Sequence, residues 1–430
     1  MWSIFILTFL IWTSVQTKQI PLSKIHLNSD GLFTDSRGFI KLFRGFNNVH
    51  KHFPWYNVNS TNITQLEMFK NWGLNVVRLG VMWSGVKPTI SIVNTTYLDV
   101  IENVIDLYAD YGIYVILDMH QDVLSSLYGL YDGIPLWLIE KFKRPPHHLQ
   151  YPWPYKKKPD FWVMSYLTYE CANGAQQLYN NVSGAWNHWG EFWEIVARRF
   201  GGKSNVLGYE LINEPPPGNF YTNPLRGLPE LNTVLRSRNV TIVCHRKVFL
   251  LLPNVISNAI RATKSTGGGR FLTEFGLCGD DGNPRSVNTI ECNNILNEAD
   301  KHFESWTYWD SNLLDLSGNP IVTEVKSFIR PYPHSIRGVF RKQQFNHETG
   351  DYHLSFIANT TKQQNNEKQT LIAEIYIPRS VHYPNGFSMS VKPDNLSTKM
   401  NENMMYVYLP SGVSNASVFV RIEIVRKSIE

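Results

Sequence analysis

The chain has 430 residues, a composition typical of a globular protein and a formal net charge of +5. This length accommodates one α/β barrel of about 250 residues together with a smaller domain. The modest charge, without a long run of Lys and Arg, excludes a strongly basic surface and therefore nucleic acid as the favoured partner. It permits a weak, peripheral attraction to anionic lipid surfaces.

The amino terminus, residues 1–22, is a short apolar run that ends in small and polar residues. This pattern is typical of a secretory signal peptide, here residues 1–17, although the usual positive charges before the run are absent. About a dozen apolar residues are too few to span a membrane, which takes about 20. Passage through the secretory pathway, to a secreted or lysosomal location, also agrees with eight glycosylation sequons: Asn59, Asn62, Asn94, Asn181, Asn239, Asn359, Asn395 and Asn415.

The chain has four cysteines, Cys171, Cys244, Cys278 and Cys292. The last two flank a loop rich in Gly, Asp and Asn that a disulfide could close. Secretion favours this bridge over four buried free thiols, which is the alternative. The pairing of the first two cysteines stays open.

Short apolar runs alternate with segments of helical period up to residue 309, as expected for repeated β-α units. Apolar spacing predicts helices over 62–72 and 97–111, which would coat a barrel. Residues 121–205 form a long, aromatic-rich insertion that we expect to lie over the active-site face. Six strands are predicted: 41–47, 75–81, 114–120, 206–213, 271–275 and 305–309.

From about Arg330 the pattern changes to alternating strands with turn signals and no helical stretch. This pattern predicts a small β-sandwich, entered through a Pro-rich linker at 330–335. The expected division is therefore a signal peptide at 1–17, a catalytic barrel at 18–329 and a β-sandwich at 330–430.

Two glutamates are predicted at the carboxyl ends of strands. Glu214 follows the apolar run of VLGYELINEP (206–215), and Glu274 ends the short strand of GGGRFLTEFG (267–276). The carboxyl ends of the strands face the substrate in a parallel α/β barrel, so both are candidate catalytic residues. A pair of carboxylates in this place predicts cleavage of a glycosidic bond, with about 5 Å between them in a retaining enzyme.

Other polar residues at strand ends are predicted to support this pair. Asn213 is placed to donate to a sugar 2-hydroxyl, and Arg78 to steady the nucleophile through a charged hydrogen bond. His120 and Asp122 could bind sugar hydroxyls, and Trp309 could form a floor for the sugar ring. The structural alternatives are a core ion pair for the arginine, a backbone-bonded histidine and a helix-capping aspartate.

The chain resembles glycoside hydrolase family five of clan A and, within it, the endoglycoceramidase-like branch. The resemblance covers most of the chain and rests on RGFNNVHK (44–51), NVVRLG (75–80), LDMHQDV (117–123), DGIPLW (132–137), WNHWGEFW (186–193), LINEP (211–215), GGGRFLTEFG (267–276) and YW (308–309). It implies a (β/α)8 barrel with Glu214 as acid/base and Glu274 as nucleophile. It also implies sugar contacts from Lys51, Asp122, Asn213 and Trp309.

The sequence departs from that family between the two glutamates. Only 60 residues separate Glu214 from Glu274, whereas three β-α units of about 30 residues each would take about 90. Residues 240–252 supply one strand at most, so we expect a barrel shortened between strands four and seven. The His-Tyr pair of the family is missing too, because His245 is followed by Arg246.

The resemblance implies hydrolysis of glycosphingolipids at the bond between oligosaccharide and ceramide. It implies no metal or organic cofactor. We expect the protein to be a monomer. One alternative is a β-glucosidase or endoglucanase of the same family. The other is a glycolipid-binding paralogue or splice form that keeps the fold but not the turnover.

Overall fold

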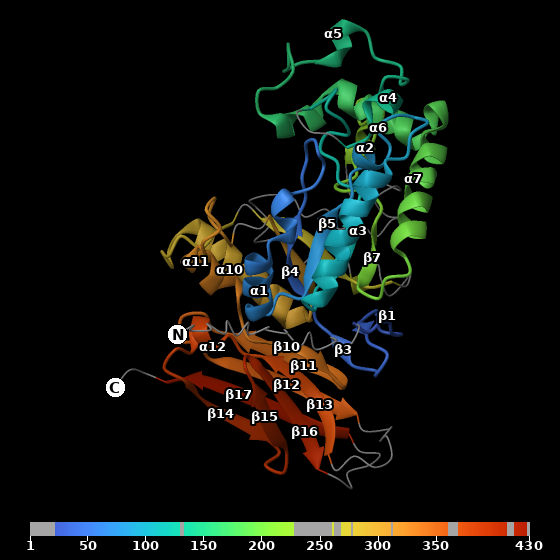
Figure 1. Cartoon of the computed structure of the whole chain (residues 1–430). Coiled ribbons are helices and arrows are strands. Elements are labelled where there is room, and N and C mark those ends of the chain that lie inside the picture. The colour runs from blue at the N-terminus through green and yellow to red at the C-terminus, as the bar shows by residue number, and fades with distance from the viewer. Residues whose placement is uncertain are drawn as a thin grey trace, which may run out of the picture.

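The computed structural model describes residues 22–129, 133–227, 260–261, 268–276, 278–310, 313–359, 369–410 and 417–427. Figure 1 shows a parallel sheet with its helices in the middle of the molecule and antiparallel sheets at one end. The parallel sheet contains β4 (Arg44–Asn48), β5 (Val76–Gly80), β6 (Tyr114–Asp118), β7 (Val206–Glu210), β8 (Phe271–Gly276) and β9 (Ser305–Trp309).

These six strands are the six predicted from the sequence, each within three residues of the expected ends. Their order is β7-β6-β5-β4-β9-β8, so the last strands of the chain pair beside the first, as in a barrel. Every residue of β5 and β6 is buried, as in strands covered on both faces. The intervening strand expected within 240–252 lies outside the described residues.

Helices cover the sheet where apolar periodicity predicted them. The helix expected at 62–72 is α1 (Ile63–Asn71), and the one expected at 97–111 is α3 (Thr95–Asp110). Asn62 and Asn94 cap their amino ends by accepting from backbone N–H groups. The other helices of this part are α2 (Trp83–Val86), α10 (Val287–His302), α11 (Val322–Phe328), η1 (Val58–Thr61) and η4 (Pro224–Gly227).

The insertion after β6 is largely helical. It forms the end of the molecule opposite the antiparallel sheets (Figure 1). Its elements are α4 (Leu136–Ile139), α5 (His147–Gln150), η2 (Trp162–Leu167), α6 (Tyr169–Tyr179), η3 (Val182–Gly184) and α7 (Ala185–Phe200). Within the described ranges, no helix is long and apolar enough to cross a membrane.

The C-terminal part folds into two antiparallel sheets, ordered β1-β2-β3-β10-β13-β16-β15 and β11-β12-β17-β14. The first draws three strands from the start of the chain: β1 (His26–Leu27), β2 (Phe33–Thr34) and β3 (Ile40–Lys41). The others are β10 (Tyr332–Ile336), β11 (Gly338–Phe345), β12 (Tyr352–Asn359), β13 (Gln369–Tyr376), β14 (Phe387–Lys392), β15 (Ser397–Asn401), β16 (Met404–Pro410) and β17 (Ser417–Arg426), with helix α12 (Arg379–His382).

Two expectations about this part need correction. Residues 26–41 were assigned to the barrel, but β3 pairs with β10 through Lys41 and Ser335. The Pro-rich stretch 330–335 is not a linker, because most of it forms β10. Its register shifts between Pro333 and Ser335, and a bulge is where a strand tolerates proline.

The antiparallel sheets contact the barrel at the amino ends of its strands. Tyr332 donates from its hydroxyl to the Gly73 carbonyl at 2.6 Å, and Tyr376 donates to the Asn71 carbonyl at 2.9 Å. Both acceptors precede β5 in the chain. The carboxyl ends of the strands therefore remain free for a site on the opposite side.

Candidate active site

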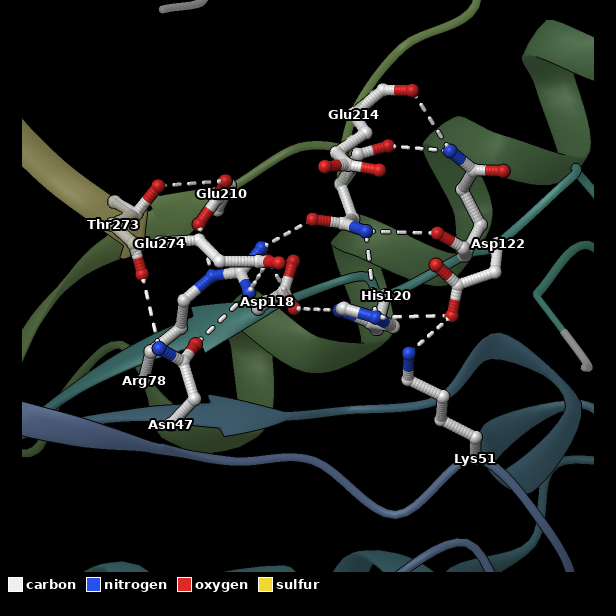
Figure 2. A network of polar contacts seen from close by, with 12 residues as sticks. Asn47, Lys51, Arg78, Asp118, His120, Asp122, Glu210, Glu214, Thr273 and Glu274 are labelled. Carbon is white, nitrogen blue, oxygen red and sulfur yellow. Dashed lines mark hydrogen bonds and ion pairs between the residues drawn. The ribbon is translucent and has the colours of Figure 1, made fainter. Parts of the chain in front are cut away.

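Arg78, in the middle of β5, is the centre of the polar network in Figure 2. Its guanidinium is fully buried, and it forms ion pairs with three carboxylates: Glu210 at 2.7 Å, Glu274 at 2.9 Å and Asp118 at 3.2 Å. Burial lowers the pKa of Arg78, but these three carboxylates raise it well above its usual range. A permanent cation therefore holds together side chains from β5, β6, β7 and β8.

The turn after β7 is fixed by a reciprocal set of amide hydrogen bonds. Asn213 donates from Nδ2 to the Gln121 carbonyl at 2.9 Å and accepts from Arg78 Nη2 at 2.7 Å. Gln121 donates from Nε2 to the carbonyls of Asn213 and Glu214 at 2.6 and 3.0 Å. Glu214 is held with a positive φ of 35°, a backbone strain that only surrounding contacts can maintain.

Glu214 has the electrostatics of a general acid. Burial raises its pKa, and the neighbouring carboxylates of Glu274 and Asp122 raise it further, to about 7. His120 and Arg78 oppose this shift without cancelling it. A carboxyl group with this pKa is still protonated near neutral pH and can donate a proton to a leaving group.

A second cluster lies beside the first, at the ends of β4, β6 and β9. Lys51 Nζ pairs with Asp122 Oδ2 at 2.6 Å and lies 4.4 Å from the centre of the Trp309 ring. His120 stacks on Trp309, with ring centres 5.2 Å apart and planes 7° apart, and pairs with Asp118 at 2.8 Å.

Charge, not desolvation, decides the protonation of this second cluster. Burial lowers the pKa of His120, but Asp122 and Asp118 raise it to about 9. Burial raises the pKa of Asp122, yet His120 and Lys51 hold it well below its usual range. At neutral pH the cluster therefore presents an imidazolium and an ammonium on either side of a carboxylate.

The structure brings all eight predicted site residues into one connected region: Lys51, Arg78, His120, Asp122, Asn213, Glu214, Glu274 and Trp309. Six of them lie at or just after strand ends, as expected, but Arg78 lies in the middle of β5 and Glu274 lies within β8. Their individual roles remain a proposal. His245 and the stretch around it lie outside the described residues.

Sequence reasoning missed several residues of this network. Glu210 bonds both Arg78 Nε and Thr273 Oγ1, the latter at 3.1 Å. Asp118 joins the arginine to the histidine, and Asn47 accepts from Arg78 Nη1 at 3.0 Å. Asp118 and Glu210 are the last residues of mainly apolar strands, and that position was the available signal. Asn47 lies in the polar strand β4 and carried no such signal.

The two cysteines of the predicted disulfide lie in contact. Cys278 and Cys292 are buried, separate thiols with Sγ atoms 2.7 Å apart. The bridge stays a prediction. Cys171 is a buried free thiol in α6, and Cys244 lies outside the described residues.

In the part of the chain that the structure describes, no group of three or more His, Cys, Asp or Glu side chains is arranged to hold a metal ion. The side chains of the site offer carboxylates, amides, a buried guanidinium and an imidazolium. A glutamate following strand β7 and a second on β8, in electrostatic contact, define the class of α/β-barrel glycoside hydrolases.

Comparison with known proteins identifies the family. The model described as cellulase (glycosyl hydrolase family 5) matches residues 34–243, and the glycoside hydrolase family 5 C-terminal domain matches residues 330–424. The chain belongs to glycoside hydrolase family 5. The predicted barrel with a C-terminal β domain, and the predicted glycosidase class, are thereby confirmed.

Individual proteins are similar over nearly the whole chain. An endoglycoceramidase of Cyanea nozakii is 27% identical over 453 residues, covering 87% of this chain and 88% of its own. Endoglycoceramidase I of Rhodococcus hoagii is 26% identical, covering 85% and 82%. The solved structure of endo-glycoceramidase II from Rhodococcus sp. in complex with ganglioside GM3 shares the fold, with a TM-score of 0.65, 18% identity and coverage of 92% and 99%.

Proposed function

We propose that this protein is a retaining endoglycoceramidase, which hydrolyses the β-glycosidic bond between the oligosaccharide and the ceramide of glycosphingolipids. The observation that carries the proposal is the difference between the two glutamates. Glu214 is kept protonated by burial and by Glu274, whereas Glu274 faces the guanidinium of Arg78 at 2.9 Å. The name of the full-length relatives, endoglycoceramidase, supports the substrate class.

The reaction then proceeds by double displacement. Glu274 attacks the anomeric carbon of the ceramide-linked sugar while Glu214 donates its proton to the departing ceramide oxygen. Glu214, now ionised, accepts a proton from water, and the resulting hydroxide releases the oligosaccharide from Glu274. Asn213 is placed beside the acid/base to donate to the sugar 2-hydroxyl, and Trp309 with His120 provides a flat surface for a sugar ring.

The proposal includes the setting of the enzyme. The signal-like amino terminus and the sequons support a secreted or lysosomal glycoprotein. We expect a monomer that contacts lipid surfaces peripherally, because its substrate is anchored by ceramide.

The test is incubation of the purified secreted protein with a ganglioside that carries a fluorescent ceramide, beside Glu274→Gln. Release of intact oligosaccharide and fluorescent ceramide by the native protein alone supports the proposal. Release of single glucose units instead would favour a β-glucosidase. A folded protein that binds the ganglioside without cleaving it would favour the non-catalytic paralogue.

A further inference from the structure

The segment between α4 and η2, residues 140–161, is here named the tip segment. It contains α5 and lies at the end of the molecule farthest from the antiparallel sheets (Figure 1). Two of its large apolar side chains are turned to solvent, Trp153 at 91% and Phe161 at 64% exposure. Rings this exposed are unusual in a protein that buries most of its other aromatics, and they mark a surface that interacts.

The tip segment also holds most of the net charge of the protein. Its 22 residues include six Lys or Arg against two acidic residues, a net +4 out of the +5 of the whole chain. Lys157 pairs with Asp160 at 3.0 Å and Arg144 with Glu170. The exposed cations are Lys141, Lys143, Arg144, Lys156 and Lys157.

The tip segment adjoins the candidate active site. Phe161 directly precedes η2, and the first residue of η2, Trp162, has its ring 5.6 Å from Lys51 Nζ. Phe53, two residues after that lysine, is 81% exposed in the loop that follows β4. Apolar and basic side chains are therefore concentrated at the end of the barrel that carries the site.

We propose that the tip segment docks this protein on the surface of an anionic phospholipid bilayer. Tryptophan and phenylalanine rings favour the boundary between headgroups and acyl chains, and lysines beside them are attracted to anionic headgroups. A soluble polyanion would satisfy the lysines but would leave Trp153 and Phe161 in water. This proposal rests on the proposed function and deepens it. When the tip segment is bound to the bilayer, the active site lies next to a glycolipid substrate held in the same bilayer.

The test is flotation of the full-length protein with vesicles of phosphatidylcholine alone or with phosphatidylserine. We expect binding to the mixed vesicles that weakens as salt rises. Lys156→Gln with Lys157→Gln should weaken it on the order of 25-fold, about fivefold for each charge. Trp153→Ala with Phe161→Ala should weaken it about tenfold or more.

Matched controls come from the opposite end of the molecule. Phe419→Ala, at a residue 52% exposed on β17, and Lys342→Gln with Lys399→Gln, both exposed, should bind as the native protein does. Equal binding by tip and control variants would overturn the proposal. Two other outcomes would also overturn it. Loss of vesicle binding in the lysine variant but not in the aromatic variant would favour a polyanion as the occupant. Concentration-dependent self-association that Trp153→Ala abolishes would favour a second copy of the chain.

Hydrolysis of a water-soluble aryl β-glycoside separates this inference from the proposed function. Tip variants that keep this hydrolysis but lose vesicle binding support the docking surface. Native protein that floats with the mixed vesicles but cleaves neither soluble nor lipid substrate would refute the proposed function and leave the docking surface standing.

Discussion

Burial and two neighbouring carboxylates give Glu214 a pKa of about 7, so this residue is protonated when the reaction begins. The proton that it donates is available below that pH and is lost above it. We therefore expect kcat/KM to fall as pH rises through about 7. In Glu214→Gln this basic limb should disappear and kcat/KM should drop by about 10² to 10⁴, measured as a pH profile on ganglioside.

The same variant distinguishes an acid/base from a structural residue. A substrate with a good leaving group needs no proton, so Glu214→Gln should still form the glycosyl-enzyme with an activated aryl glycoside. Persistence of the basic limb in Glu214→Gln would assign the limb to another group.

Glu210 shows how a residue away from the reacting bond can position the nucleophile. It accepts from Arg78 Nε at 2.7 Å and from Thr273 Oγ1 at 3.1 Å, and so ties β7 to β8 beside Glu274. Glu210→Ala should free the guanidinium and lower kcat on the order of 100-fold with little change in KM, because misplacing a reacting group by about 1 Å costs that much.

The conservative variant tests this positioning role. Glu210→Gln keeps one oxygen to accept from Arg78, and its amide N–H can donate to Thr273 Oγ1 in place of the oxygen that now accepts from it. It should therefore recover much of the lost kcat. The exposed Glu194, on α7, provides a matched control as Glu194→Gln. Equal losses in the Ala and Gln variants would contradict positioning through hydrogen bonds.

At the scale of elements, the sequence predicted what local patterns encode. Buried strands such as β5 and β6 are mainly apolar runs, and the carboxyl ends of parallel strands must meet at one edge of the sheet. The positions of Asp122 and Glu214, which follow β6 and β7, agree with that rule, whereas Arg78 lies within β5. Glu210 was missed because its partners lie 132 and 63 residues away in the chain. The two-residue strands β1, β2 and β3 are too short to show any period. Only their pairing defines them, β1 with β2, β2 with β3 and β3 with β10.

The predicted disulfide would join the segment after β8 to helix α10. Cys278 follows β8 and Cys292 lies in α10, both buried. In the oxidised protein, peptide mapping by mass spectrometry without reduction should find these two residues cross-linked. Because the bridge closes a loop of about 15 residues, Cys292→Ser should lower the free energy of unfolding by about 3 kcal/mol. Alkylation of both thiols in unreduced, unfolded protein would contradict the bridge.

At the scale of the whole molecule, the candidate active site and the antiparallel sheets lie at opposite ends of the parallel strands. The site lies where the parallel strands end, and the antiparallel sheets pack where those strands begin. The first sheet joins both ends of the chain through β3 and β10. Loss of this pairing should therefore weaken the fold without changing the geometry around Arg78.

Glu374, on β13, is the charged centre of that pairing. It accepts from Ser335 Oγ at 2.8 Å and lies 3.8 Å from Lys41 Nζ and 3.5 Å from His334 Nδ1. Burial raises the pKa of Glu374, but His334 and Lys41 outweigh burial and hold it well below its usual range. Its contribution to stability is therefore present above the unfolded pKa of about 4.3 and is lost as pH falls through the lower folded value.

Glu374→Gln should lower the free energy of unfolding by about 3 to 5 kcal/mol near neutral pH, because it leaves Lys41 buried without its carboxylate. Urea denaturation of both proteins measures this difference. It should shrink as pH falls below about 4, because the carboxylate of the unfolded native sequence then takes up a proton while that of the folded protein stays ionised. Glu423→Gln, at a half-exposed pair with His353 on the neighbouring sheet, should cost at most about 1 kcal/mol. Ganglioside hydrolysis at low temperature should be equal in all three proteins, since Glu374 supports the joined sheet and not the site. If the difference in unfolding free energy between the native protein and Glu374→Gln is constant with pH, packing and not charge holds β3 against β10.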